Sequence, residues 1–254
     1  MRIAYLGEDF CGSQYQPGYR TVMGDIIIDL ERISGGKTGD WFDLKAAGRT
    51  DRGVNAIDNV VVFNTAFDDD GELLKALNSV SKGIYYRSVA TVDKDFNPRY
   101  ANSRTYRYIL PIEDMDLVLA EKCSRLFLGK HDFVRFCKAD DKPTEIELTS
   151  ITMERKGHDL VLTFTSQFFL WNMIRKIVAA ICAVAKGERC LEDVERALEG
   201  KDINFGLARP DALTLTEVRY DGLVFNEPQE RYYSERVDEE LFRGRIKEDF
   251  FRSL

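Results

Sequence analysis

The sequence predicts an α+β fold in which two ferredoxin-like halves, each of the order β-α-β-β-α-β, form one continuous mixed β-sheet with helices packed on it. Short apolar runs alternate with longer stretches in which apolar residues recur at helical spacing, and this order of elements occurs twice. The composition, 44% hydrophobic and 31% charged residues, is that of a globular protein. We expect the halves to span residues 1–102 and 103–254.

The first half is predicted from six apolar segments separated by turn residues. Asp69 and Glu72 have the spacing of a capping box and mark the start of its second helix. In chain order we expect a strand at 2–6, a helix at 22–33, strands at 41–47 and 57–63, a short helix from 69, and a strand at 84–92.

The second half repeats this order with one more helix. We expect a strand at 105–110, a helix at 117–126, a hairpin at 147–155 and 160–165, a long buried helix at 168–185, a short helix at 191–198 and a closing strand at 213–220. The charged tail at 228–254 is expected to form an amphipathic helix or a docking strip.

Charge and composition restrict the class of protein. The net charge of −7 opposes a polyanionic partner. However, the stretches 96–112 and 160–187 contain no acidic residue and carry cations such as Arg104 and Lys176. The acidic residues gather elsewhere, at 68–70, 140–147 and 227–249. An RNA-binding face therefore stays possible. The five scattered cysteines and two distant histidines predict no metal site and a reduced, cytoplasmic protein, and no stretch resembles a signal peptide or membrane span.

The chain is organised around the loop at 46–56, where Gly48 and Gly53 bracket Arg49, Asp51 and Arg52. A carboxylate between guanidinium groups is expected to stay ionised well below neutral pH. On a tight loop it suits a nucleophile or an anchor for a cationic transition state. The alternative is that Asp51 only closes a turn between two strands.

The stretch Gly48-Arg49-Thr50-Asp51-x-Gly53-Val54 resembles the signature of the TruA-type tRNA pseudouridine synthases. Further stretches are similar to that family in the same order: Phe10 to Gly24, Arg104 to Tyr108, Leu128 to Phe133, Phe169 to Val178, and Arg209 to Leu215. Ser13 replaces a usual aromatic residue, and Asn55 replaces a common histidine.

The resemblance implies a pseudouridine synthase fold and roles for five residues. Asp51 is implied as the catalytic nucleophile, acting at C1′ of the ribose or at C6 of the base, and Arg175 as the catalytic partner that keeps it ionised. Tyr106, Arg49 and Arg104 are implied as substrate-binding residues, with Tyr106 covering the target base.

The position of Arg175 can also be argued without the resemblance. It shares a helical face with Trp171, Val178 and Cys182, so its guanidinium is expected to lie against the core and within salt-bridge reach of Asp51. The alternative is that the side chain reaches the surface.

We therefore expect an enzyme that isomerises uridine in tRNA, with no metal and no other cofactor. The resemblance points to positions 38–40 in the anticodon stem-loop and to a homodimer. A non-catalytic tandem RNA-binding protein of RRM type is the main alternative, although no RNP1-like run occurs. A glycoside hydrolase would require two well-placed carboxylates, and only one is visible.

Overall fold

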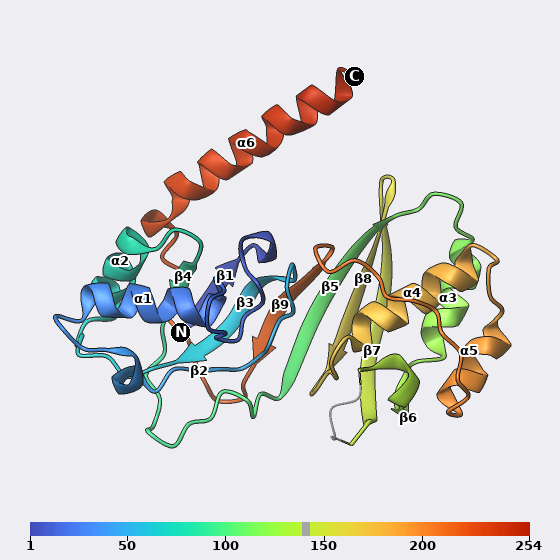
Figure 1. Cartoon of the computed structure of the whole chain (residues 1–254), viewed down its shortest axis with the longest axis horizontal. Coiled ribbons are helices and arrows are strands. Elements are labelled where there is room, and N and C mark those ends of the chain that lie inside the picture. Colours follow the sequence, from blue (N-terminus) through green and yellow to red (C-terminus); the bar gives the residue numbers. More distant parts are fainter. Residues whose placement is uncertain (139–142) are drawn as a thin grey trace.

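The computed structural model describes residues 1–138 and 143–254, so Asp140 and Asp141 of the predicted acidic stretch lie outside the described residues. Its strands form one mixed sheet of the order β4-β1-β3-β9-β5-β8-β7-β6, with β2 paired to β3 (Figure 1). The strands are β1 (Arg2–Tyr5), β2 (Lys45–Ala46), β3 (Asn55–Val62), β4 (Tyr85–Ser88), β5 (Ser103–Pro111), β6 (Gly129–Asp132), β7 (Glu145–Lys156), β8 (Asp159–Ser166) and β9 (Leu213–Arg219). The predicted α+β fold class, with one continuous mixed sheet, is confirmed.

The two halves join in the middle of the sheet through the parallel pair β3 and β9. Ala56 on β3 lies opposite Leu215 on β9, which in turn lies opposite Tyr106 on β5. These three residues are therefore abreast on adjacent strands. The loop that leads into β3 is thereby brought close to Tyr106, although the two are far apart in the sequence.

Two groups of helices stand over the two ends of the sheet (Figure 1). The helices are α1 (Val22–Ile33), α2 (Asp70–Val80), α3 (Leu117–Arg125), α4 (Met173–Ala185), α5 (Leu191–Leu198) and α6 (Ser234–Arg252). Helix α4 buries nine of its residues, as its almost uninterrupted apolar sequence requires. The side chain of Asp69 accepts a hydrogen bond from the Glu72 amide and so caps α2 as the capping-box spacing predicts.

The structure differs from the predicted elements mainly at three places. The helix expected at 168–185 begins only at Met173, because Asn172 adopts the left-handed conformation, with φ 63°. The strand expected at 41–47 is reduced to β2 and is preceded by the 3-10 helix η2 (Gly39–Phe42). The stretch 128–133, for which no strand was predicted, contains the short edge strand β6, which pairs with β7.

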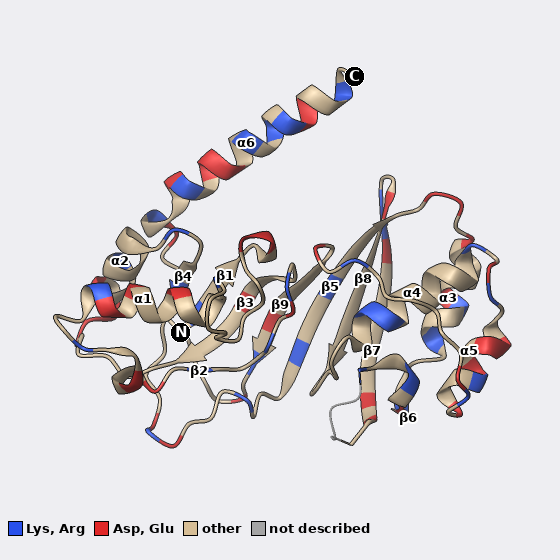
Figure 2. Ribbon diagram, in the orientation of Figure 1, with Lys and Arg blue, Asp and Glu red and all other residues tan. Residues whose placement is uncertain are grey.

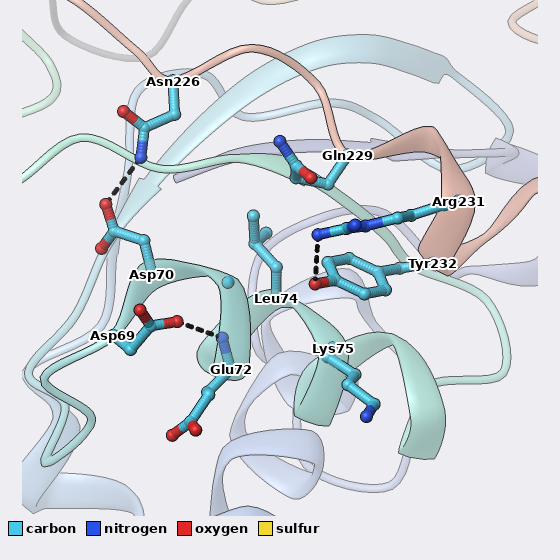
Figure 3. A pocket seen from close by; sticks show the side chains of 10 residues that line it. Asp69, Asp70, Glu72, Leu74, Lys75, Asn226, Gln229, Arg231 and Tyr232 are labelled. Carbon is cyan, nitrogen blue, oxygen red and sulfur yellow. Dashed lines mark hydrogen bonds between the residues drawn. The ribbon is translucent and has the colours of Figure 1, made fainter.

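The tail returns to the first half, although we assigned it to the second; the division into 1–102 and 103–254 itself stays a prediction. The Asn226 amide donates to the Val89 carbonyl at 2.9 Å, and the Arg236 guanidinium donates to the carbonyls of Ser81 and Ile84. A pocket lies where the tail crosses α2, next to the hydrogen bond from Asn226 to Asp70 (Figure 3). Neither Asp51 nor Arg175 lines this pocket.

Beyond Arg236, α6 extends away from the rest of the molecule and carries charges of both signs (Figure 2). Five of its large apolar side chains are exposed, namely Leu241, Phe242, Ile246, Phe250 and Phe251. The helix predicted for the tail is confirmed; packing of its apolar side chains is not observed in the described chain. Among the described residues, no helix is both long enough and apolar enough to cross a membrane.

Candidate active site

The loop between β2 and β3 is fixed by close backbone packing. Gly53 has φ 83°, in the left-handed region that glycine adopts without strain. Gly7, on the 3-10 helix η1 (Gly7–Asp9), lies so close to this loop that an added Cβ would come within 2.4 Å of the Gly53 carbonyl carbon. A side chain at position 7 would therefore displace the loop that carries Asp51.

Polar contacts hold Thr50, the residue before Asp51, from two sides. The Thr50 amide donates to the Ser13 hydroxyl at 2.8 Å, and the Ser13 amide donates to the Thr50 carbonyl at 2.9 Å. The Thr50 hydroxyl also lies 2.9 Å from the Tyr5 hydroxyl. Because Thr50 and Ser13 are both buried, these bonds are expected to fix the backbone of the loop firmly. Ser13 thus has a structural role in holding the loop.

Asn55 also joins the loop to its surroundings. Its side-chain oxygen accepts from the Gly7 amide at 2.8 Å, and its side-chain nitrogen donates to the Asp211 carbonyl at 2.8 Å. The amide group can do both at once because it carries an acceptor and a donor. Asn55 therefore connects the start of β3 to segments from both halves of the chain.

The ion pair between Asp51 and Arg175 is present, as the sequence predicts. Arg175 Nη1 lies 3.8 Å from Asp51 Oδ2, and the side chains are 13% and 36% exposed, respectively. Arg175 is oriented by two further contacts: its Nε donates to the Ala208 carbonyl at 2.7 Å, and its Nη1 donates to Asn172 Oδ1 at 3.1 Å. The guanidinium is therefore held beside the carboxylate instead of reaching into solvent.

The electrostatics of Asp51 differ from the prediction. Burial raises the pKa of the Asp51 carboxyl above its ordinary value, because the charged form loses water. The positive charge of Arg175, a hydrogen bond from the Trp171 side chain and the charge of Lys138 all oppose this rise in pKa. The neighbours Arg49 and Arg52 are not among these causes, so the stabilising cations come from the second half of the chain.

Tyr106 lies beside this pair in the centre of the sheet. Its side chain is buried, and its ring contacts Phe169 edge to face with 5.2 Å between the centroids. The Tyr106 hydroxyl lies 3.9 Å from the position that a Cβ on Gly48 would occupy, so the ring reaches the Asp51 loop. Burial raises the pKa of the Tyr106 phenol, which keeps it protonated at neutral pH.

The other two predicted substrate-binding residues occupy different environments. Arg49 is exposed, next to Asp51 in the loop. Arg104 is only 6% exposed, and its guanidinium donates to the carbonyls of Ala47, Arg99 and Gln167. It thereby connects the segments that lead into the Asp51 loop and into α4.

Three residues that the sequence analysis left without a role also belong to the site. Asn172 orients Arg175, the Trp171 side chain lowers the pKa of the Asp51 carboxyl, and Lys138 lies 3.8 Å from the centroid of the Trp171 ring. A sequence signal for Asn172 existed, since asparagine tolerates the left-handed conformation that ends or begins a helix. No periodic pattern marks Lys138, because its position depends on contacts between distant segments.

The arrangement is suited to chemistry at an electron-poor centre. A half-exposed carboxylate, ionised with the help of a fixed guanidinium, can attack such a centre or stabilise positive charge on it. A buried aromatic ring beside it provides a surface for a flat, unstacked base. Exposed Lys138 adds positive charge beside Asp51, and exposed Arg49 lies two residues before it in the loop.

Comparison with known proteins identifies relatives that match this chain over almost its whole length. Residues 123–221 match the family model described as tRNA pseudouridine synthase. The chain is 36% identical to tRNA pseudouridine synthase A of Thermococcus sibiricus, with 100% of this chain and 98% of the relative covered. It is also 36% identical to the proteins of the same name from Pyrococcus abyssi, covering 96% of this chain and 93% of the relative, and from Thermococcus kodakarensis, covering 98% and 97%.

Among solved structures, the chain is similar to the crystal structure of a Cbf5-Nop10-Gar1 complex. The TM-score is 0.38 and the sequence identity 12%, over 72% of this chain and 45% of that chain. A likeness at this level carries no conclusion about function.

Proposed function

The chain belongs to the tRNA pseudouridine synthase A family, whose members isomerise uridine in tRNA, and we propose that it does so with Asp51 as nucleophile and Arg175 as its positioning partner. The observation that carries this assignment is the ion pair of 3.8 Å between the two side chains. A largely covered arginine that is held by two further hydrogen bonds and directed at a half-exposed carboxylate is the geometry that a charged nucleophile requires.

The isomerisation moves the uracil ring without a net change in redox state. The C1′–N1 glycosidic bond breaks, the ring turns, and a C1′–C5 bond forms, while C5 loses a proton and N1 gains one. Asp51 attacks either C1′ of the ribose or C6 of the ring, and on both routes its negative charge is needed. The reaction requires no oxidant, so the residues of the chain suffice for the steps described.

Tyr106 covers the target base in this proposal, because its ring lies at the Asp51 loop in the centre of the sheet. Its raised pKa makes it a poor base at neutral pH, so its main contribution is contact with the uracil. Arg49, exposed beside Asp51, holds the flipped nucleotide. Arg104 supports the substrate site from inside through its three carbonyl contacts.

Asp51→Asn tests the proposal directly. The substitution keeps the size of the side chain and removes its charge, so we expect at least about a 1000-fold loss of activity with tRNA affinity within about twofold of wild type. The assay is release of tritium from tRNA labelled at uridine C5, since that hydrogen must leave when C5 becomes the glycosidic carbon. Asp211→Asn, a change of the same kind on a more exposed carboxylate, is the control.

Equal tritium release by Asp51→Asn and wild type would remove Asp51 from the chemistry. Tight tRNA binding without release by the wild-type protein would instead favour the RNA-binding module of RRM type.

The proposal extends to the substrate position and to the assembly. We assign the activity to uridines of the anticodon stem-loop, at positions 38–40, in a cytoplasmic homodimer. Sequencing of pseudouridine in tRNA that has been treated with the enzyme tests the positions, and light scattering of the purified protein tests the dimer. Modification confined to another arm of the tRNA, or a monomeric mass, contradicts the respective part.

A further inference from the structure

Trp171 is a large aromatic side chain that stays exposed beside the proposed nucleophile. It is 45% exposed, although an indole is usually largely buried in a folded protein. It precedes Asn172, whose left-handed backbone starts α4, and its side chain is near enough to Asp51 to lower the pKa of that carboxyl. The indole is therefore placed at the entrance to the site.

Contacts from Lys138 hold this indole in place. The Lys138 amide donates to the Trp171 carbonyl at 2.8 Å, and the Lys138 ammonium lies 3.8 Å from the centroid of the Trp171 ring. A cation over an aromatic face stabilises the pair by electrostatic attraction. The result is an oriented aromatic surface with a positive charge attached.

The neighbouring aromatic residues point to an RNA strand as the occupant. Phe169 packs inward against Tyr106. Phe168, in contrast, is as exposed as Trp171, and the centroid of its ring lies 5.5 Å from the guanidinium carbon of Arg104. Exposed aromatic rings interleaved with cations are typical of surfaces that stack unpaired bases and contact their phosphates. Because Tyr106 is buried and assigned to the target uracil, the exposed Trp171 is left for another base.

We propose that Trp171 stacks on a nucleobase adjacent to the target uridine while Lys138 contacts a phosphate of the same strand. This inference rests on the proposed function, because it takes the RNA strand to enter at Asp51. It adds a substrate-contacting residue that the sequence motifs did not identify.

The chain offers a matched control, because it contains only two tryptophans. Trp41 is 37% exposed and has Lys37 at 5.1 Å from its ring centroid, so it resembles Trp171 in exposure and in its cationic neighbour. The Trp41→Phe protein therefore retains only the indole of Trp171, and the Trp171→Phe protein retains only the indole of Trp41. The Asp51→Asn background prevents turnover during a titration with tRNA.

Base stacking on Trp171 should quench its emission. We expect the Trp41→Phe protein to lose fluorescence along a curve that matches tRNA binding measured by filter retention, and the Trp171→Phe protein to change little. Unchanged emission of the Trp41→Phe protein at saturating tRNA overturns the proposal.

Affinity gives a second readout in the protein with Asp51 intact. Trp171→Ala should raise the KM for tRNA by about 5- to 150-fold, the usual range for losing one stacked base, with kcat within about threefold. The KM should rise less in Trp171→Phe, and the KM of Trp41→Ala should equal that of wild type. An unchanged KM in a folded Trp171→Ala protein contradicts the proposal; if that variant does not fold, the fluorescence of the Trp41→Phe protein decides.

Failure of the proposed function is distinguishable from failure of this inference. Absence of tritium release by the wild-type protein rejects the enzymatic assignment, whereas the fluorescence titration needs only RNA binding. Quenching confined to Trp171 supports the stacking contact whatever the outcome of the activity assay.

Discussion

Asp51 is the residue at which burial and charge act in opposite directions. Burial raises the pKa of its carboxyl, and Arg175 is the largest of the opposing causes. The site thus accepts the cost of a partly buried carboxylate and compensates it with a cation whose own position is fixed by Ala208 and Asn172. A nucleophile that has lost part of its water is also more reactive than one in bulk solvent.

This balance predicts that replacing Arg175 shifts the pH dependence of activity. Since the reaction needs ionised Asp51, activity should fall as the pH drops through the raised pKa of this carboxyl. In Arg175→Met the opposing charge is lost, so that pKa rises further and the acidic limb of the profile moves to higher pH. We expect at least about a tenfold loss of kcat/KM at pH 7, with a smaller loss in Arg175→Lys, which keeps the charge.

The measurement is the rate of tritium release between about pH 4 and pH 8, with RNA affinity determined in parallel at each pH. An acidic limb at the same pH in Arg175→Met and wild type would show that Arg175 does not control the ionisation of Asp51.

At the scale of elements, the start of α4 connects folding to chemistry. Asn172 holds a left-handed conformation that begins the helix, and its side chain accepts from Arg175 at 3.1 Å. One residue therefore determines both where the helix starts and where the guanidinium points. The aromatic segment before it stays outside the helix and is free to surround the site.

Substitutions at Asn172 separate these two tasks. Asn172→Gly keeps the backbone conformation but removes the contact with Arg175, so we expect about a tenfold loss of kcat with little change in Tm. Asn172→Ala loses the contact and adds backbone strain of roughly 1 kcal/mol, so its Tm should be lower than that of the glycine variant. Thermal unfolding by circular dichroism and tritium release measure the two effects.

Full activity of Asn172→Gly would mean that the Ala208 carbonyl alone orients Arg175. A higher Tm for the alanine variant than for the glycine variant would show that the left-handed backbone is not needed there.

The sequence predicted these elements unequally well, for physical reasons. The strands and helices of both halves follow from periodic burial, and the Asp51–Arg175 pair follows from the rarity of an unpaired arginine in a core. The start of α4 was missed, because residues 168–171 are as apolar as the helix itself, and only the backbone of Asn172 separates them. Arg104 was expected to face the RNA but is buried against three backbone carbonyls. Its burial was missed because contacts with backbone carbonyls leave no signal in the pattern of side chains.

At the scale of the whole molecule, the excess of acidic residues must be reconciled with an RNA substrate. The net charge is −7, but β5 and α4 carry basic residues and no acidic ones (Figure 2). Two of the basic residues expected to bind RNA are engaged inside: Arg104 donates to three carbonyls, and Lys176 donates to those of Arg135 and Cys137. Charge reversal at either position would disturb the fold together with any RNA contact.

The exposed cations at the site give a cleaner test. Arg52 and Lys138 are both exposed; Arg52 follows Asp51 in the loop, whereas the charge of Lys138 acts on Asp51 from the second half of the chain. Each phosphate contact that is lost should reduce the slope of log K against log salt concentration by about 0.7 to 0.9. We therefore expect Arg52→Gln and Lys138→Gln to weaken tRNA binding most at low salt and to lower that slope individually, with roughly additive effects in the double variant.

Lys122→Gln, an equal change on the exposed face of α3, should leave the slope unchanged. Filter binding between about 50 and 300 mM salt measures the four variants and wild type. Identical slopes for the double variant and wild type would place the RNA backbone on another face, whereas a loss at Lys122→Gln of equal size would show that binding follows the net charge alone.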